Sequence, residues 1–141
     1  MIESERREAL DHLIRALEVE YRFILYYPRL ERLMPDGDTA SKVRTLGQAS
    51  LRHAETVSQA ILALGGTATV PTVEPLPDPL DLKALFRIQL KYEKLALWLY
   101  TRAAALVPLE LAPRFGELAR EEERHIKMTE DILHRLHTAE G

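Results

Sequence analysis

Five ionisable residues of the types that bind divalent metals are spread along the 141-residue sequence. Each falls within a stripe of residues spaced three and four apart, the pattern of a helix face turned toward a core. A carboxylate or imidazole in a dry core is costly unless it is paired or holds a cation. Three carboxylates with two imidazoles form a ligand set for iron, manganese or zinc. The residues are Glu20, His53, Glu93, Glu122 and His125.

The elements that must position these residues are long helices. Proline and glycine gather at three places, and the segments between them are glycine-poor and periodic at helical spacing. The only strand-like alternation, Thr67–Val73, is short and flanked by prolines. The pattern predicts an all-α protein, a four-helix bundle in a single domain spanning 1–141. The helices are expected over 3–34, 38–64, 79–107 and 110–138.

The polar residues of each pair of helices are predicted to lie at the same height. Glu20 and His53 are equally distant from the turn at 35–37, and Glu93 is about as far from Pro108 as Glu122 and His125 are. In an antiparallel hairpin, residues equidistant from the turn are level. The longer connection between the second and third helices is a crossover that makes them parallel. We therefore expect two antiparallel hairpins joined by a long crossover.

The two halves also resemble each other. Tyr27 follows Glu20 by seven residues, and Tyr100 follows Glu93 by the same interval. A pseudo-twofold pair of hairpins would place one Glu and one His from each half around a shared point. The repeat further predicts an acidic residue at position 50, but Ser50 stands there.

The order of these segments resembles the ferritin-like carboxylate-bridged di-iron proteins, close to bacterioferritin and the rubrerythrin-type domain. Such bundles supply one Glu from each of two helices and a Glu-x-x-His pair from each of the other two. The resemblance implies a site for two iron ions, or one, with manganese or zinc as possible occupants. Tyr27, Tyr100 and Ser50 would lie beside the ligands. The segments that carry the resemblance are Glu20–Tyr27, Arg52–Gly66, Lys91–Ala96 and Glu121–Ile126.

Ser50 departs from the family pattern, which has a metal-bridging Glu three residues before the helix-two His. Its counterpart Glu122 is present. The loss leaves three alternatives: two metals completed by water or an anion, one metal, or none. The implied function is non-haem iron binding with oxidation of Fe(II) or reduction of O2 or peroxide, and a peroxidase would need an external electron donor. The alternative is a dimeric ferritin-like binding or scaffold module without catalysis.

The sequence also excludes or disfavours several other kinds of cofactor, partner and location. Leu51 replaces the Met through which bacterioferritin binds haem, so no haem is expected. The absence of cysteine excludes thiolate metal sites and disulfides. A net charge of −3 without a basic face argues against a nucleic-acid partner. No run of about 18 apolar residues predicts a membrane span, and no signal core precedes the first helix, so we expect a cytoplasmic protein.

Apolar residues away from the inward stripes predict a helix-packed homodimer face. They form one group on the third helix and one on the first. The two groups are Leu95, Trp98 and Leu99, and Phe23, Tyr26 and Leu30.

Overall fold

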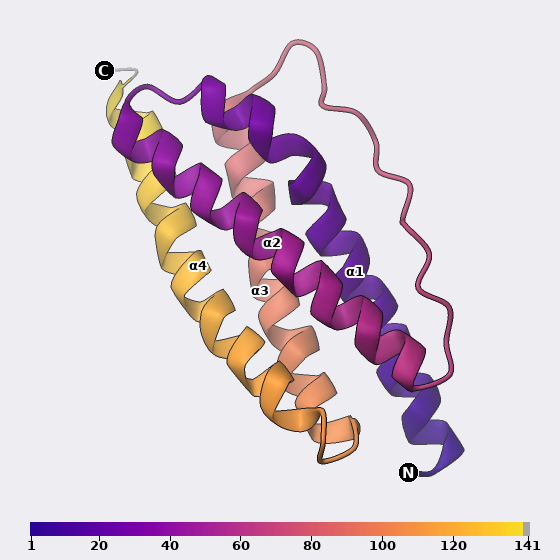
Figure 1. The fold of residues 1–141 in the computed structure, drawn as a ribbon. Helices are drawn as coiled ribbons and strands as arrows, with labels where there is room; N and C mark the ends of the chain where they lie inside the picture. Colours follow the sequence, from indigo (N-terminus) through magenta and orange to yellow (C-terminus); the bar gives the residue numbers. More distant parts are fainter. Residues whose placement is uncertain (140–141) are drawn as a thin grey trace.

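The computed structural model describes residues 1–139 and contains four helices. They are α1 (Glu3–Arg32), α2 (Gly37–Ala63), α3 (Leu82–Leu106) and α4 (Ala112–Ala139). No strand occurs within this range, and Thr67–Val73 runs without regular structure. The predicted all-α bundle is confirmed (Figure 1).

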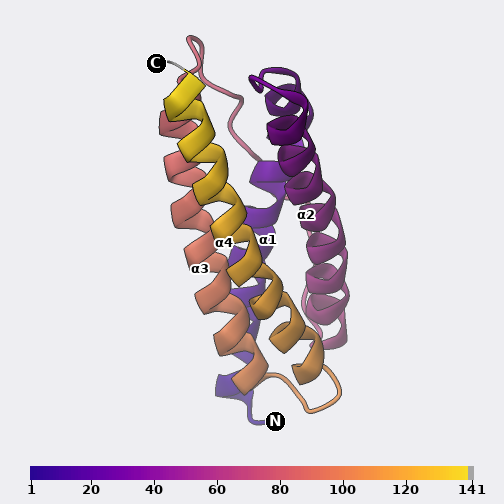
Figure 2. The ribbon, with the colours of Figure 1, turned by 90° about the vertical axis from the view of Figure 1, so that its left-hand side faces the viewer.

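The helices form the two expected antiparallel hairpins, α1 with α2 and α3 with α4 (Figures 1 and 2). The connection over 64–81 runs back along the bundle, so α2 and α3 point the same way. Across the bundle, α1 packs on α3 more extensively than α2 packs on α4. None of the helices in this part of the chain is long and apolar enough to cross a membrane.

Local signals set the helix ends. The Asp36 side chain accepts a hydrogen bond from the Thr39 amide and caps α2, and Asp81 does the same for α3 through Ala84. The second and third helices therefore begin at 37 and 82 rather than at 38 and 79. Gly65 follows α2 with φ of 82°, a left-handed conformation that glycine adopts without a Cβ clash.

The apolar core is divided into two clusters with a polar layer between them. One cluster takes α1 from Ala9 to Val19 and α3 from Ala96 to Leu106. The other takes α1 from Phe23 to Leu30 together with Leu85 and Phe86 of α3. The ionisable residues singled out in the sequence lie between these two clusters along every helix. The bundle thus isolates them from water on both sides.

The predicted dimer face is largely wrong. Phe23, Tyr26, Leu30 and Leu99 are at most 5% exposed, because α1 packs on both α2 and α3 and so buries a wider arc than a single stripe. Among the residues of these two groups, Trp98 is the one with a largely exposed side chain, at 54%. Its ring contacts His12 of α1 edge-on, with the centroids 5.1 Å apart.

Candidate metal centre

All five predicted ligands lie in the polar layer, and none is more than 7% exposed. Each helix presents its ligands from within one turn of its midpoint. The structure thus brings into one core layer the side chains that were predicted to be level because they are equally distant from a hairpin turn. They are Glu20 from α1, His53 from α2, Glu93 from α3, and Glu122 and His125 from α4.

His53 is the point where the two halves of the bundle meet. Its Nδ1 lies 3.1 Å from Glu122 Oε1, to which it donates a hydrogen bond, and 3.0 Å from Glu20 Oε2. A single N–H donates fully to only one of these oxygens. Glu20 Oε2, although fully buried, has no hydrogen-bond partner among the described residues.

His125 completes a compact donor cluster with His53 and Glu122. The two imidazole rings are stacked, with centroids 5.5 Å apart and planes inclined by 19°, and His125 Nδ1 lies 3.8 Å from Glu122 Oε1. One ligand atom from each of these three residues lies within 4.8 Å of the other two. Because bonds from such donors to a first-row divalent cation are about 2.0–2.2 Å long, a small inward shift of side chains would bring each of the three within reach of a cation in this layer.

Glu93 is oriented by its own half of the bundle. Thr129 Oγ1 donates to Glu93 Oε1 at 2.8 Å, and Gln89 Nε2 donates to the same oxygen at 3.3 Å. The second oxygen, Oε2, is buried and has no hydrogen-bond partner. Glu93 therefore holds one oxygen fixed and leaves the other available.

Glu121 is a residue of the site that the sequence analysis missed. Its Oε2 lies 3.1 Å from His53 Nε2, on the side of the ring opposite Glu20, and its Oε1 lies 3.9 Å from His125 Nε2. Arg52 donates to Glu121 Oε1 at 3.1 Å from the surface. Glu121 sits in a run of three glutamates, so the sequence alone does not distinguish it from its exposed neighbour Glu123.

The three residues expected beside the ligands take different places. Ser50 is buried one turn before His53 on α2. Tyr100 is fully buried, its hydroxyl has no hydrogen-bond partner, and its ring meets the His53 ring at 87°. The ring of Tyr27 lies so close over Gly47 that a Cβ on that glycine would fall 2.0 Å from it. Tyr27 thus packs the α1–α2 contact.

The charges of the layer are balanced by protons. Burial raises the pKa of Glu20 to about 7 and raises the pKa of Glu93 well above its ordinary value. Burial opposes a charged His53, but the hydrogen bond to Glu122 and the adjacent Glu20 carboxylate outweigh it and raise the pKa of His53 to about 11. Burial likewise opposes an ionised Glu122, yet the two neighbouring imidazoles, His125 and His53, lower its pKa. The His53 imidazolium is therefore the cation that offsets the buried carboxylates.

This donor set fits a divalent metal. Carboxylate oxygens of Glu20 and Glu93 are buried with unused lone pairs, and such groups are rare in native cores without a partner. Carboxylate and imidazole together are donors that suit iron, manganese and zinc. A cation of charge two would replace the protons that now neutralise the layer and would satisfy the orphaned oxygens.

The chain belongs to the ferritin-like family: the Ferritin-like domain model matches residues 10–139. One similar solved structure is a dodecameric thioferritin, the bacterioferritin-related protein of Bacteroides fragilis. Its TM-score is 0.76 at 17% identity, over 96% of this chain and 89% of that one. A second, a ferritin-like diiron-carboxylate protein of Bacillus anthracis str. Ames, gives 0.75 at 20% identity, over 94% and 99%. At such identities these structures support the fold. No curated protein matches the sequence.

Proposed function

We propose that this chain is a non-haem iron-binding protein that uses its core centre to oxidise Fe(II) or to reduce O2 or peroxide. The observation that carries the proposal is the pair of buried, unpartnered carboxylate oxygens, Glu20 Oε2 and Glu93 Oε2, on either side of the His53–Glu122–His125 cluster. A scaffold without metal would gain nothing from leaving these oxygens unsatisfied, since each costs free energy in a dry core.

The ligands divide between two adjoining positions. Glu20 and His53 would hold one ion, Glu93 and His125 would hold the other, and Glu122 would serve both. Ser50 supplies a hydroxyl where a second shared carboxylate would complete the pair. Water or a small anion would then take that place, and the occupancy would be two ions or one. Manganese and zinc suit the same donors, and haem is not expected because Leu51 offers no axial ligand.

Iron bound here would supply one-electron redox chemistry toward O2 or peroxide, and continued turnover as a peroxidase would draw on an external electron donor. The chain's own task is to manage protons and orientation. His53 must release its Nδ1 proton to solvent before that nitrogen can bind a metal, because its two neighbours, Glu122 Oε1 at 3.1 Å and Glu20 Oε2 at 3.0 Å, are themselves needed as ligands. Glu121, 3.1 Å from Nε2, would keep the opposite N–H and fix the ring.

The test pairs metal-dependent stability with oxygen consumption. Fe(II) added anaerobically at ~100 times its Kd should stabilise the fold by about 2.7 kcal/mol, and a chelator should reverse the gain. Aerobic addition should then consume O2 in proportion to protein. If Fe(II) leaves the melting temperature unchanged and O2 consumption does not exceed the protein-free rate, the scaffold function is favoured instead.

We also propose that the chain self-associates as a homodimer in the cytoplasm, through the outer face of the α1–α2 hairpin, without nucleic acid or membrane partners. Four apolar side chains of α1 and α2 are exposed, with exposures from 42% to 62%. The four residues are Ile14, Leu25, Leu51 and Leu62. Light scattering should give twice the chain mass, and Leu25→Lys should halve it. A thioferritin similar to this chain is dodecameric, so a larger assembly is a further outcome that would replace the dimer.

A further inference from the structure

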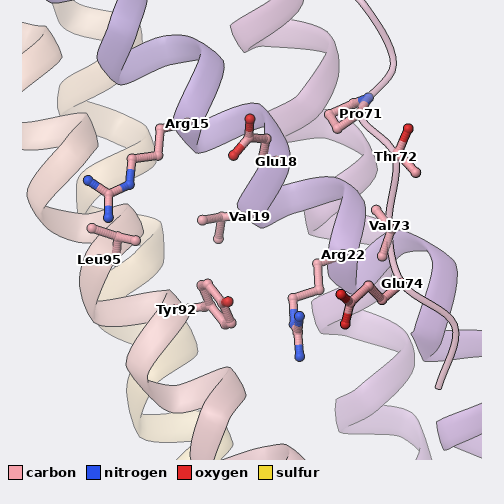
Figure 3. A pocket seen from close by; sticks show the side chains of 10 residues that line it. All are labelled: Arg15, Glu18, Val19, Arg22, Pro71, Thr72, Val73, Glu74, Tyr92 and Leu95. Carbon is pink, nitrogen blue, oxygen red and sulfur yellow. The ribbon is translucent and has the colours of Figure 1, made fainter. Parts of the chain in front are cut away.

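The crossover forms the roof of a cavity of 450 Å³ on the outside of the α1–α3 seam. Residues 71–74 pass over it, and its other walls come from α1 and α3 (Figure 3). The Tyr26 hydroxyl donates a hydrogen bond to the Glu74 carbonyl, which ties the roof to α1. The cavity is a built feature of the fold and lies apart from the ligands of the metal centre.

Arg22 is the unusual residue of this cavity. Residues 1–139 contain three half-buried arginines, Arg6, Arg22 and Arg135. Arg6 pairs with Glu3, and Arg135 pairs with Asp131. Arg22 makes no ion pair within the described chain, although it is shielded to a similar degree.

Two aromatic rings hold the Arg22 guanidinium in place. Its central carbon lies 4.8 Å from the centre of the Tyr92 ring and 5.4 Å from that of Tyr26. Such stacking fixes the plane of the guanidinium and leaves its N–H edge free for a planar anion. Arg22 is thus oriented for a bidentate contact with a carboxylate.

The other walls narrow the chemistry of a ligand. Arg15, two turns earlier on α1, also lines the cavity without an ion pair in the described part of the chain. Glu18 and Glu74 line it too, so the site would repel a molecule with several negative charges. Val19 and Leu95 provide an apolar surface between the charged groups.

We propose that this cavity binds a small organic molecule that carries one carboxylate on a flat apolar body. The carboxylate lies against Arg22, and the apolar body extends between Leu95, Val19 and the crossover toward Arg15 at the far end of the cavity. Binding here is a property of the α1–α3 seam and needs no occupant in the metal centre.

Amide chemical-shift titration of the ¹⁵N-labelled protein tests the proposal with two probes that share an indole ring. Indole-3-acetate carries the carboxylate, and tryptamine carries an ammonium in its place. We expect saturable shifts with indole-3-acetate at 15–22, 72–74 and 92–95, with a Kd of ~1 mM or below. Arg22→Gln should weaken binding about 10-fold or more, whereas Arg29→Gln, an exposed arginine of the same helix, should leave it unchanged.

Three results would overturn the site: no saturable shift up to about 10 mM, equal binding of tryptamine, or full affinity in Arg22→Gln. The amide spectrum itself reports whether Arg22→Gln still folds. If it does not, Arg15→Gln decides, because Arg15 is exposed and its loss does not disturb the seam. A drop of roughly 3-fold in affinity supports the proposal, and no change contradicts it.

Discussion

The two hairpins carry the same ligand types at the same heights but support them differently. In the α3–α4 hairpin, Glu93 receives hydrogen bonds from Thr129 and Gln89. The positions that correspond to these donors in the α1–α2 hairpin hold Val57 and Ala16, both fully buried and apolar. Glu20 therefore has no donor from its own half apart from His53.

If the layer binds metal as proposed, this difference predicts which half depends on the cation. The α3–α4 half keeps both Glu122 and a pre-oriented Glu93, so its ligands are arranged without metal. The α1–α2 half has Ser50 in place of the carboxylate and holds Glu20 only through the His53 imidazolium. In that half a proton on His53 takes the place that a metal would fill.

Glu122→Gln should have the largest effect on metal binding, because Glu122 is the carboxylate that contacts both His53 and His125. We expect metal affinity to fall at least ~100-fold, since an amide oxygen is a weaker ligand and carries no charge. Calorimetric titration with Co(II), a stable substitute for Fe(II), measures the change. Glu123→Gln, one residue along and exposed, is the matched control. Equal affinity in the two variants would contradict the shared role.

Ser50→Glu should make the halves alike and so sharpen the comparison. The metal-free protein should lose roughly 1–3 kcal/mol of unfolding free energy, because another carboxylate enters a layer that is already acidic. The Kd of a second ion should then be at least about 10-fold lower than in the wild type. Denaturation and Co(II) titration follow the two changes, with Ser50→Ala as the control. A more stable metal-free protein with unchanged stoichiometry would show that position 50 does not face the metals.

Changing the pH should shift the balance between protons and metal. The folded-state pKa of Glu20 is raised from 4.5 to about 7, so the folded protein holds the extra proton and loses that stabilisation as the pH rises through this range. His53, raised from 6.5 to about 11, contributes stability that is complete below pH 6.5 and declines above it. Stabilisation by Mn(II) should therefore grow between pH 5 and 8, as measured by denaturant titration at each pH. A metal effect that is flat over this range would argue against proton displacement.

Thr129→Val should produce the smallest change in stability, and it should affect the α3–α4 half alone. Loss of one hydrogen bond to Glu93 should lower the unfolding free energy of the metal-free protein by about 0.5–1.5 kcal/mol. Thr101→Val is the control, since its hydroxyl bonds to a backbone carbonyl on the exposed face of α3. Should the two variants lose the same amount, Glu93 would not depend on Thr129 for its orientation.

Much of this architecture follows from sequence patterns, because helix length and turn position determine which residues of a hairpin are level. Equal distance from the turn is enough to predict that Glu20 is level with His53 and Glu93 with Glu122. The three-and-four spacing around Glu122 and His125 likewise predicts an inward face of α4 that includes Leu118, Thr129 and Leu136, and all three are buried.

The remainder depends on how the helices are rotated against one another. Glu121 and Glu123 are the same residue type, and only the angle at which α4 faces α2 puts one against His53 and the other in solvent. Phe23 and Leu30 are buried because α1 has two neighbours, which periodicity within a single helix cannot reveal. The cavity beside Arg22 requires the path of the crossover, which has no periodic signal.

Elemental mass spectrometry after anaerobic loading with Fe(II) and desalting tests most directly whether the core layer is a metal centre. We predict one or two iron ions per chain in the wild type and none in Glu122→Gln. Two would mean that water or an anion replaces the missing carboxylate, and one would mean that the better-arranged half binds alone. A wild-type protein that retains no iron would contradict the account and leave a ferritin-like bundle without the metal chemistry.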